Sequence, residues 1–227
     1  MPPASNPPAD EVVLLLHGLG RSRISMWPLA RCLRSAGWRV VNVGYPGLRA
    51  PLPLIADTIL APLLSGHPVL RAARRIHVVT HSMGGILLRQ FLVNHDFPKL
   101  GRVVMLAPPN RGSEVADWLR HWPAWWCLGG PNRRLLGTRD SDLPAQLPTA
   151  RPGWGILAAA RPRALPFGPW MPGDNDGLVA VARTHLAGEA DFREVRSAHM
   201  FVMWNRAVHR HVLHFLAAGR FADDTRR

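Results

Sequence analysis

The chain has 227 residues, 47% of them hydrophobic, which is enough to bury a substantial core within one domain. No apolar run approaches the roughly 20 residues that a membrane-spanning helix needs, and residues 1–10 lack the charged start and apolar core of a secretory signal, which predicts a cytoplasmic protein. The formal net charge of +13 comes almost wholly from scattered arginines without interleaved aromatic residues, so we expect no nucleic-acid partner.

The first part of the chain alternates apolar runs with helical patterns. Val12–Leu16 is continuously apolar and predicts a buried strand, which ends in the His-Gly-Leu-Gly sequence of residues 17–20. Ser22 is placed to cap a helix over about 24–36, and Gly37 is placed to end it. A strand over 38–43 and a proline-interrupted helical segment over about 52–64 follow.

The same alternation continues through the middle of the chain. It predicts a β-branched strand over 74–79, a buried helix over 86–93 and a strand over 102–106. Strands that are apolar throughout and separated by helices are typical of a parallel sheet covered on both faces. We therefore expect an α/β fold, whose ligands bind beyond the carboxyl ends of the strands.

Residues 111–172 differ from the rest because they are rich in Trp, Pro, Gly and Arg. A strand predicted over about 155–160 leaves a connection of about 40 residues before it, and such long connections are commonly lids or binding loops. Glu114–Trp126 has the spacing of an amphipathic helix. The tryptophans of this stretch either fill a small core of their own or wall a substrate pocket; they are Trp118, Trp122, Trp125, Trp126, Trp154 and Trp170.

These patterns predict a single domain over residues 11–220, with a cap-like insertion at about 111–154. A flexible leader is expected at 1–10 and a tail at 221–227. The two cysteines, Cys32 and Cys127, are too few for a disulfide framework and are expected to be free thiols.

Ser82 lies where the strand over 74–79 must reverse into the following helix within a few residues, in the sequence Thr-His-Ser-Met-Gly-Gly of residues 80–85. Such a turn lifts the hydroxyl above the edge of the sheet, and the glycines let the helix pass close to the strand. Thr80 stands where the usual pattern has a smaller residue. The alternative is a serine that only caps a buried helix, but the pattern favours a nucleophile elbow with Ser82 as the nucleophile.

A serine hydroxyl needs a base to activate it, and the base needs an acid to orient it. His199 follows a short strand and precedes a helix over about 204–216, so its imidazole is the predicted base. Asp176 precedes a glycine and an apolar segment and is favoured as the acid over Asp174, which would orient the same turn. No metal site is expected, because the histidines of the last helix form no paired ligand face and the Asp-Asn-Asp-Gly turn lacks the glutamate of a calcium loop.

A tetrahedral intermediate at this serine also needs hydrogen-bond donors for its oxyanion, and backbone amides supply them most rigidly. The amide of Met83 follows the nucleophile at the start of the helix, and the amide of Leu19 lies in the loop after the first strand. These two amides are the predicted oxyanion hole. His17 is expected to brace the loop and to take no part in the chemistry.

Together these motifs resemble those of the compact α/β-hydrolases related to small bacterial lipases and esterases, over nearly the whole chain. The resemblance implies the α/β-hydrolase fold: a mostly parallel sheet with helices on both faces, here with a Trp-rich cap. It implies Ser82, Asp176 and His199 as the catalytic residues, the amides of Leu19 and Met83 as the oxyanion hole, and no cofactor. One group of bacterial hydrolases also carries Thr at the position of Thr80, whereas Ala198 stands where the family has a glycine.

We therefore expect a hydrolase that cleaves carboxylic esters through an acyl-enzyme, with a small-molecule ester or a lipid of medium or long acyl chain as its substrate. A thioesterase, an amidase or an acyltransferase would use the same residues, and a non-catalytic lipid-binding module would keep the same fold. The basic, Trp-bearing surface also allows peripheral contact with an anionic membrane. Nothing in the residue pattern indicates the oligomeric state.

Overall fold

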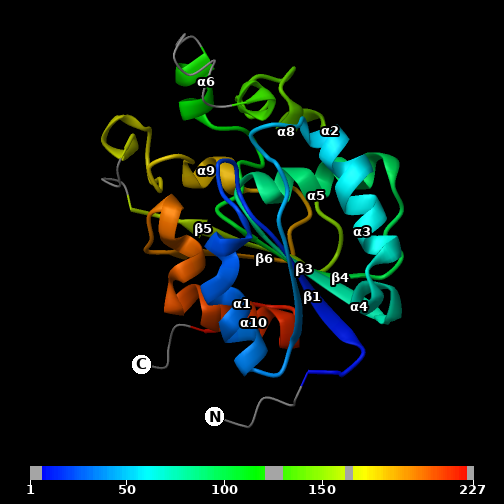
Figure 1. The fold of residues 1–227 in the computed structure, drawn as a ribbon. Helices are drawn as coiled ribbons and strands as arrows, with labels where there is room; N and C mark the ends of the chain where they lie inside the picture. Colours follow the sequence, from blue (N-terminus) through cyan, green and yellow to red (C-terminus); the bar gives the residue numbers. More distant parts are fainter. Residues whose placement is uncertain (1–6, 121–129, 162–165, 224–227) are drawn as a thin grey trace.

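The structure, a computed structural model, describes residues 7–120, 130–161 and 166–223. Its centre is a six-stranded sheet in the order β2-β1-β3-β4-β5-β6, in which every neighbouring pair is parallel (Figure 1). The strands are β1 (Glu11–Leu16), β2 (Arg39–Val43), β3 (Arg75–His81), β4 (Leu100–Leu106), β5 (Trp154–Ala159) and β6 (Asp191–Val195). The predicted parallel α/β architecture is confirmed.

Helices cover both faces of this sheet. The longer ones are α1 (Trp27–Ser35), α5 (Met83–Asn94) and α10 (Arg206–Ala218); the shorter ones are α2 (Leu52–Ile55), α3 (Ala61–Gly66), α4 (Pro68–Ala72), α6 (Glu114–Arg120), α8 (Leu143–Gln146) and α9 (Val181–Thr184). Short 3-10 segments are η1 (Arg23–Met26), η3 (Pro131–Arg134), η4 (Gly168–Trp170) and η5 (His199–Trp204). In the part of the chain described, no helix has the length and apolarity to cross a bilayer.

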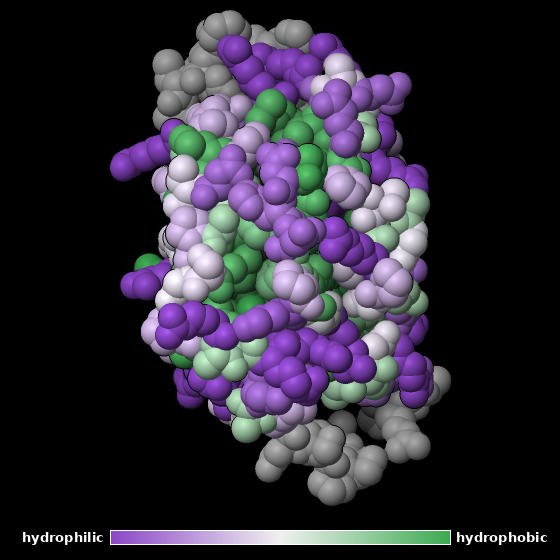
Figure 2. All heavy atoms as spheres, turned by 90° about the vertical axis from the view of Figure 1, so that its right-hand side faces the viewer, coloured by the Kyte–Doolittle hydropathy of each residue, from purple (hydrophilic) through white to green (hydrophobic). Residues whose placement is uncertain are grey.

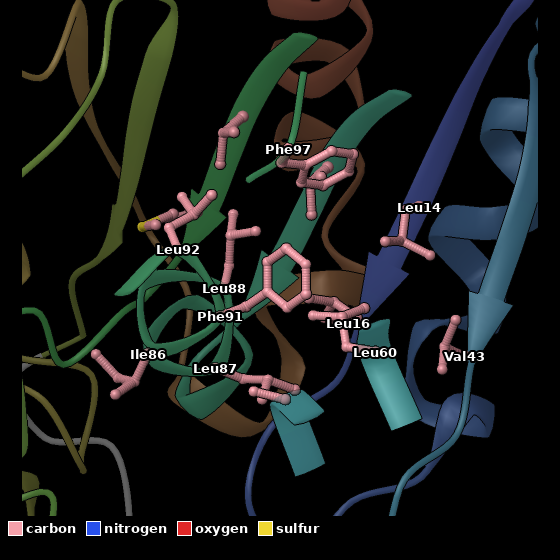
Figure 3. Packing of buried hydrophobic residues seen from close by; sticks show 14 of the residues in the cluster. Leu14, Leu16, Val43, Leu60, Ile86, Leu87, Leu88, Phe91, Leu92 and Phe97 are labelled. Carbon is pink, nitrogen blue, oxygen red and sulfur yellow. The ribbon is translucent and has the colours of Figure 1, made fainter. Parts of the chain in front are cut away.

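Two hydrophobic cores lie on opposite faces of the sheet because successive strand residues point to opposite sides. Val13 and Leu15 of β1 pack with α1 and α10. Leu14 and Leu16 point the other way and pack with α2 and α5. Figure 3 shows the second core from close by, with Phe91 of α5 facing Leu16. β1 and β5 are buried along their whole length, which is why they are almost entirely apolar, whereas the edge strands β2 and β6 are only partly buried and carry polar residues.

Two predicted helices differ from the structure in detail. The first begins as a 3-10 turn, η1, because the Ser22 hydroxyl accepts a hydrogen bond from the Ile24 amide and holds the entry tightly. The helix predicted over 52–64 is interrupted by the π-helical turn η2 (Ala56–Leu60), in which the Ala61 amide bonds to the Ala56 carbonyl. Pro62 follows directly and has no amide hydrogen to donate, so the chain widens by one residue there.

The connection between β4 and β5 carries α6, η3 and α8, which lie above the carboxyl ends of the strands (Figure 1). Trp154 does not belong to this connection as predicted. It is the first residue of β5 and is fully buried, because it pairs with Val103 of β4 and packs into the core on that face of the sheet. The predicted helix over 114–126 is seen as α6, which ends at Arg120; its remainder, with Trp122, Trp125 and Trp126, lies outside the described residues, as does Cys127.

Arg89 of α5 holds this connection to the body of the domain. Its side chain is 2% exposed, and its guanidinium donates to the backbone carbonyls of Asn110, Pro144, Leu147 and Pro148. Burial lowers the pKa of Arg89 to about 10, which leaves it charged at neutral pH. One buried cation thus gathers carbonyls from two segments that would otherwise be unsatisfied.

Asn132 ties the same connection to the segment after β2. Its amide nitrogen donates to the carbonyls of Gly47 and Ala50, at 2.7 Å each, and its side-chain oxygen accepts from the Leu52 amide at 2.8 Å. The residue is fully buried. The described part of the connection is therefore anchored to two separate parts of the fold.

Candidate active site

Ser82 stands between β3 and α5 in a backbone conformation that side-chain-bearing residues rarely adopt, with φ 52° and ψ −124°. The conformation is held from both sides, because the Ser82 amide donates to the Leu106 carbonyl and its own carbonyl accepts from the Gly85 amide, both at 2.9 Å. Strain of this kind persists only where the surrounding structure enforces it, and it is frequent at functional sites. The turn has the strand-to-helix geometry that the residue pattern predicts for a nucleophile elbow.

The two glycines after Ser82 make this turn possible. A Cβ on Gly84 would lie 2.6 Å from the Leu16 carbonyl oxygen, so only glycine lets α5 start so close to the end of β1. A Cβ on Gly85 would lie 3.3 Å from the Thr80 hydroxyl oxygen. The bulkier residue at position 80 therefore fits because position 85 carries no side chain.

Ser82, His199 and Asp176 form a hydrogen-bonded row at the carboxyl ends of the strands. His199 Nε2 lies 2.9 Å from Ser82 Oγ, and His199 Nδ1 lies 2.7 Å from Asp176 Oδ2. An ionised carboxylate only accepts hydrogen bonds, so Nδ1 carries the hydrogen and Nε2 is left to accept from the serine hydroxyl. All three residues are at least nine-tenths buried.

The carboxylate of Asp176 is fixed by its own turn. Its Oδ1 accepts from the amides of Leu178 at 3.0 Å and Val179 at 2.7 Å, and its carbonyl accepts from the His199 amide at 2.9 Å. Asp174, the other candidate, is exposed and uses only its backbone carbonyl in this turn. The structure thus places Asp176, and not Asp174, against His199.

Asn175 supports the same turn and was not singled out from the residue pattern. Its amide nitrogen donates to the carbonyls of Gly168 at 3.3 Å and Gly173 at 3.0 Å, and its oxygen accepts from the Gly177 amide at 3.0 Å. It is fully buried. The signal was present, since an Asn side chain commonly bonds to the backbone two residues ahead in a turn.

His17 and Tyr45 shape the loop after β1. The Tyr45 amide donates to His17 Nε2 at 3.2 Å, so Nδ1 carries the hydrogen and donates to the Gly18 carbonyl at 2.9 Å. The Tyr45 hydroxyl donates to the His17 carbonyl, and the two rings stack at 4.0 Å. Burial lowers the pKa of His17, which keeps it neutral in this role. His17 braces the loop as expected, whereas the part played by Tyr45 was not predicted.

The braced loop runs directly against the nucleophile. A Cβ on Gly18 would lie only 3.1 Å from Ser82 Cβ, and the next residue, Leu19, lines the cavity in front of Ser82. Met83 is the first residue of α5, where helix amides have no carbonyl partner within the helix. The fold therefore places the two residues of the predicted oxyanion hole beside Ser82.

His81 is a second buried histidine at this site that the residue pattern did not single out. Its Nε2 lies 3.1 Å from the His199 carbonyl oxygen, and the two rings are 5.0 Å apart. Burial, followed by the nearby His199, lowers the pKa of His81 well below its ordinary value. A neutral imidazole that donates to the His199 carbonyl helps to position the segment that carries His199.

A cavity of about 540 Å³ opens in front of Ser82 and His199. Its walls are mostly apolar and include Val115, Leu119 and Leu136 of the β4–β5 connection. Of the two alternatives for the tryptophans of this stretch, a place in the pocket wall does not hold for Trp118, which lines an adjoining hollow of about 260 Å³ with Leu119, Phe167 and Trp170. The reason is the helical period of α6, which turns Val115 and Leu119 inward and Trp118 outward.

A larger hollow of about 710 Å³ lies along α3, on the side of the molecule that faces the viewer in Figure 2, where hydrophobic residues show between hydrophilic ones. It reaches Ile76 at the beginning of β3, whereas Ser82 follows the end of that strand. It therefore lies away from the hydrogen-bonded row.

We compared the chain with known protein families and solved structures. The sequence profile of the alpha/beta hydrolase family matches residues 13–224, which is most of the chain. The chain belongs to the alpha/beta hydrolase family. A search of curated protein sequences found no match.

Among solved structures, this hydrolase is similar to the mature form of the Bacillus licheniformis lipase BlEst2, with a TM-score of 0.68 and 20% identity over 88% of this chain and 89% of that one. It is also similar to the phospholipase PlaB from Legionella pneumophila, with a TM-score of 0.74 and 15% identity over 94% of this chain. Lipase 1 from Pelosinus fermentans matches with a TM-score of 0.58 and 12% identity over 86% of this chain and 93% of that one.

The hydrolase spans 60% of the PlaB chain and 54% of the propeptide form of BlEst2. At these identities the likeness establishes the fold that is shared with lipases and a phospholipase.

Proposed function

We propose that this hydrolase cleaves carboxylic esters with Ser82 as its nucleophile, His199 as its general base and Asp176 as the acid that orients the base. The observation that carries the proposal is the hydrogen-bonded row of these side chains at the mouth of an apolar cavity. A serine hydroxyl, an imidazole that accepts its proton and a buried carboxylate behind the imidazole are the parts that acyl transfer requires.

In the first half of the reaction, Ser82 Oγ attacks the acyl carbon while its proton passes to His199 Nε2. The charge that develops on the carbonyl oxygen is held by the backbone amides of Leu19 and Met83. The imidazolium then gives its proton to the departing alkoxide, and the bond between the acyl carbon and the alcohol oxygen breaks. The acyl group is left on Ser82 and an alcohol is released.

In the second half, His199 takes a proton from water, and the resulting hydroxide attacks the acyl-enzyme. The tetrahedral intermediate collapses, the Ser82 oxygen leaves with the proton from His199, and the carboxylic acid is released. The cycle consumes one water and needs no redox partner. Asp176 remains ionised throughout and stabilises the imidazolium in both halves.

The shape and lining of the cavity favour an ester with an apolar acyl chain. Leu119, Leu136 and Leu178 line it, and no Asp, Glu or Lys is among its lining residues in the part of the chain described. A space of about 540 Å³ is within the range of small-molecule sites. The solved structures of lipases and a phospholipase with this fold are consistent with that preference.

A fluorophosphonate probe tests the proposal most directly, because it reacts only with a serine activated by its neighbours. We expect covalent labelling that maps to Ser82, and turnover of a p-nitrophenyl ester series with higher kcat/KM for octanoate than for acetate. Ser82→Ala should abolish both signals.

A wild type that is folded but turns over no ester faster than Ser82→Ala would overturn the proposal in favour of a non-catalytic lipid-binding module. Turnover of acyl thioesters well above that of matched oxygen esters would replace ester hydrolysis by thioesterase activity.

A further inference from the structure

A group of large apolar side chains is exposed next to the catalytic cavity, on η1, the first residue of α1, and η5. Their exposed fractions are 76% for Ile24, 54% for Trp27, 36% for Met200, 55% for Phe201 and 53% for Trp204. We call these five residues the η1–η5 face. Scattered exposed apolar residues are ordinary, but a contiguous group of this size, rich in aromatic rings, is typical of an interaction surface.

The face is continuous although its two segments lie far apart in the chain. Trp204 Nε1 donates to the Ser25 carbonyl at 3.0 Å, which joins η5 to η1 between Ile24 and Trp27. The rings of Phe201 and Trp204 meet edge to face at 5.7 Å. These contacts hold the rings at fixed positions, so binding would order few further side chains.

The two segments that carry the face contain basic residues and no acidic ones. Residues 12–56 contain six arginines and no Asp or Glu, and residues 195–222 contain four arginines and no Asp or Glu. The two segments build α1 and α10, which pack on the same face of the sheet (Figure 1). Arg23, Arg31, Arg196 and Arg206 are exposed, and the Arg31 guanidinium lies 5.7 Å from the centre of the Trp27 ring.

The face borders the entrance to the catalytic cavity. Met200 follows His199 directly and lines that cavity. Arg21, which also lines it, has Nη2 3.1 Å from Met200 Sδ. A flat surface that covered the face would therefore meet the rim of the cavity.

We propose that the η1–η5 face docks this hydrolase onto an anionic lipid surface. Indole rings partition to the level of the lipid headgroups, phenyl rings insert at the boundary with the acyl chains, and arginines attract and pair with the phosphates. A second copy of the chain is a poorer partner, because two arginine-rich surfaces would repel each other. Docking places the cavity mouth at the lipid layer, from which an acyl chain enters; this last step rests on the proposed ester hydrolysis, whereas the docking does not.

The test is co-sedimentation of the Ser82→Ala protein with vesicles made of equal parts phosphatidylcholine and phosphatidylglycerol. We expect binding that weakens strongly when the salt concentration rises from about 0.1 M to about 1 M, since the Debye length falls about threefold. Vesicles of phosphatidylcholine alone should bind far less. Each arginine near an anionic surface accounts for about a fivefold change in affinity, so Arg23→Gln/Arg31→Gln should weaken binding more than about tenfold.

Trp27→Ser/Phe201→Ser should also weaken binding at least about tenfold, because both rings lose their place among the headgroups. One matched control lies outside this face. Trp170→Ser removes a tryptophan that is 69% exposed and lines a hollow with Trp118 and Phe167, outside the η1–η5 face, and it should bind like the parent. The Trp27→Ser/Phe201→Ser substitutions are also made in the protein that keeps Ser82. There they should leave the thermal unfolding temperature and the turnover of a soluble p-nitrophenyl ester unchanged.

Three outcomes would overturn the docking proposal. They are no binding of the parent to anionic vesicles, equal loss of binding in the Trp170 control, and a dimer in solution that the Trp27/Phe201 variant dissociates while vesicles are not bound. Because sedimentation uses the Ser82→Ala protein, a failure of docking is separate from a failure of ester hydrolysis, which soluble-ester turnover by the wild type reports.

Discussion

Asp176→Asn isolates the role of the carboxylate behind the imidazole with little change in shape. In the native turn, Oδ1 accepts from the amides of Leu178 and Val179 while Oδ2 accepts from His199 Nδ1. A carboxamide has only one acceptor oxygen. We expect that oxygen to face the two backbone amides, because the reverse orientation would set its NH2 group against two N–H donors.

The NH2 group of the new side chain then faces His199 Nδ1 and donates to it. Nδ1 must be unprotonated to accept, so the ring hydrogen moves to Nε2, the atom that must take the proton of Ser82. A base held in the wrong tautomer lowers kcat by about 10⁴-fold in enzymes of this type. At about 1.36 kcal/mol per tenfold, the loss amounts to about 5 kcal/mol of transition-state stabilisation. The thermal unfolding temperature should change little, since both backbone hydrogen bonds of the turn are kept.

The assay is kcat for p-nitrophenyl butyrate, measured beside the rate of fluorophosphonate labelling at Ser82. Asp174→Asn is the matched control, because it makes the same chemical change two residues away on an exposed side chain. It should keep nearly full activity. A kcat in Asp176→Asn above roughly a tenth of the wild-type value, or an equal loss in Asp174→Asn, would refute the reasoning.

Four further predictions follow from single contacts. Gly84→Ala should lower the free energy of unfolding by about 1–3 kcal/mol in urea titrations, because the added Cβ would lie 2.6 Å from a β1 carbonyl oxygen. Gly66→Ala is the control, because a Cβ there meets open space, and it should not lower the free energy of unfolding. Equal losses in the two variants would contradict the steric argument. Arg89→Met should cost about 2–4 kcal/mol in the same titration by orphaning buried carbonyls, and a loss under about 1 kcal/mol would show that they find other partners. Burial lowers the pKa of His81, so below about pH 6.5 the unfolded chain binds more protons than the folded one, and the free energy of unfolding falls as the pH falls. His81→Gln removes this contribution, so calorimetry should show a Tm that drops less between about pH 7 and 5 in the variant than in the wild type. An equal drop in both proteins would refute the linkage. Leu119→Trp should reduce the ratio of kcat/KM for octanoate to that for acetate by about tenfold by filling the cavity, while a parallel fall for both esters would argue against an acyl site there.

The residue order was enough to predict the sheet and the elbow, because both depend on neighbours in the chain. A continuous apolar run such as Val12–Leu16 is stable only as a strand covered on both sides, and the structure has it so. The sharp reversal at Ser82, with small residues after it, follows from steric limits on the backbone. The alternation of such strands with helices then leaves few topologies open.

The pattern could not supply the contacts between distant segments. Asp174 and Asp176 are the same residue type in the same turn, so the sequence distinguishes them poorly. Only the path of the folded turn shows which carboxylate contacts His199. Likewise, the sequence shows Arg89 only as one polar residue in an otherwise apolar helix. Its role appears only in the folded structure, where it donates to backbone carbonyls more than 20 residues ahead in the chain.

The row of Ser82, His199 and Asp176, the aliphatic walls of the cavity in front of it and the η1–η5 face all combine segments that are remote in the chain. His199 lies 117 residues from Ser82, and Trp204 lies 179 residues from Ser25. The local sequence shows which residues are apolar, which are charged and which favour turns. Which of them meet depends on how the two cores close around the sheet, because burial of apolar surface is a property of the whole fold and not of any one segment.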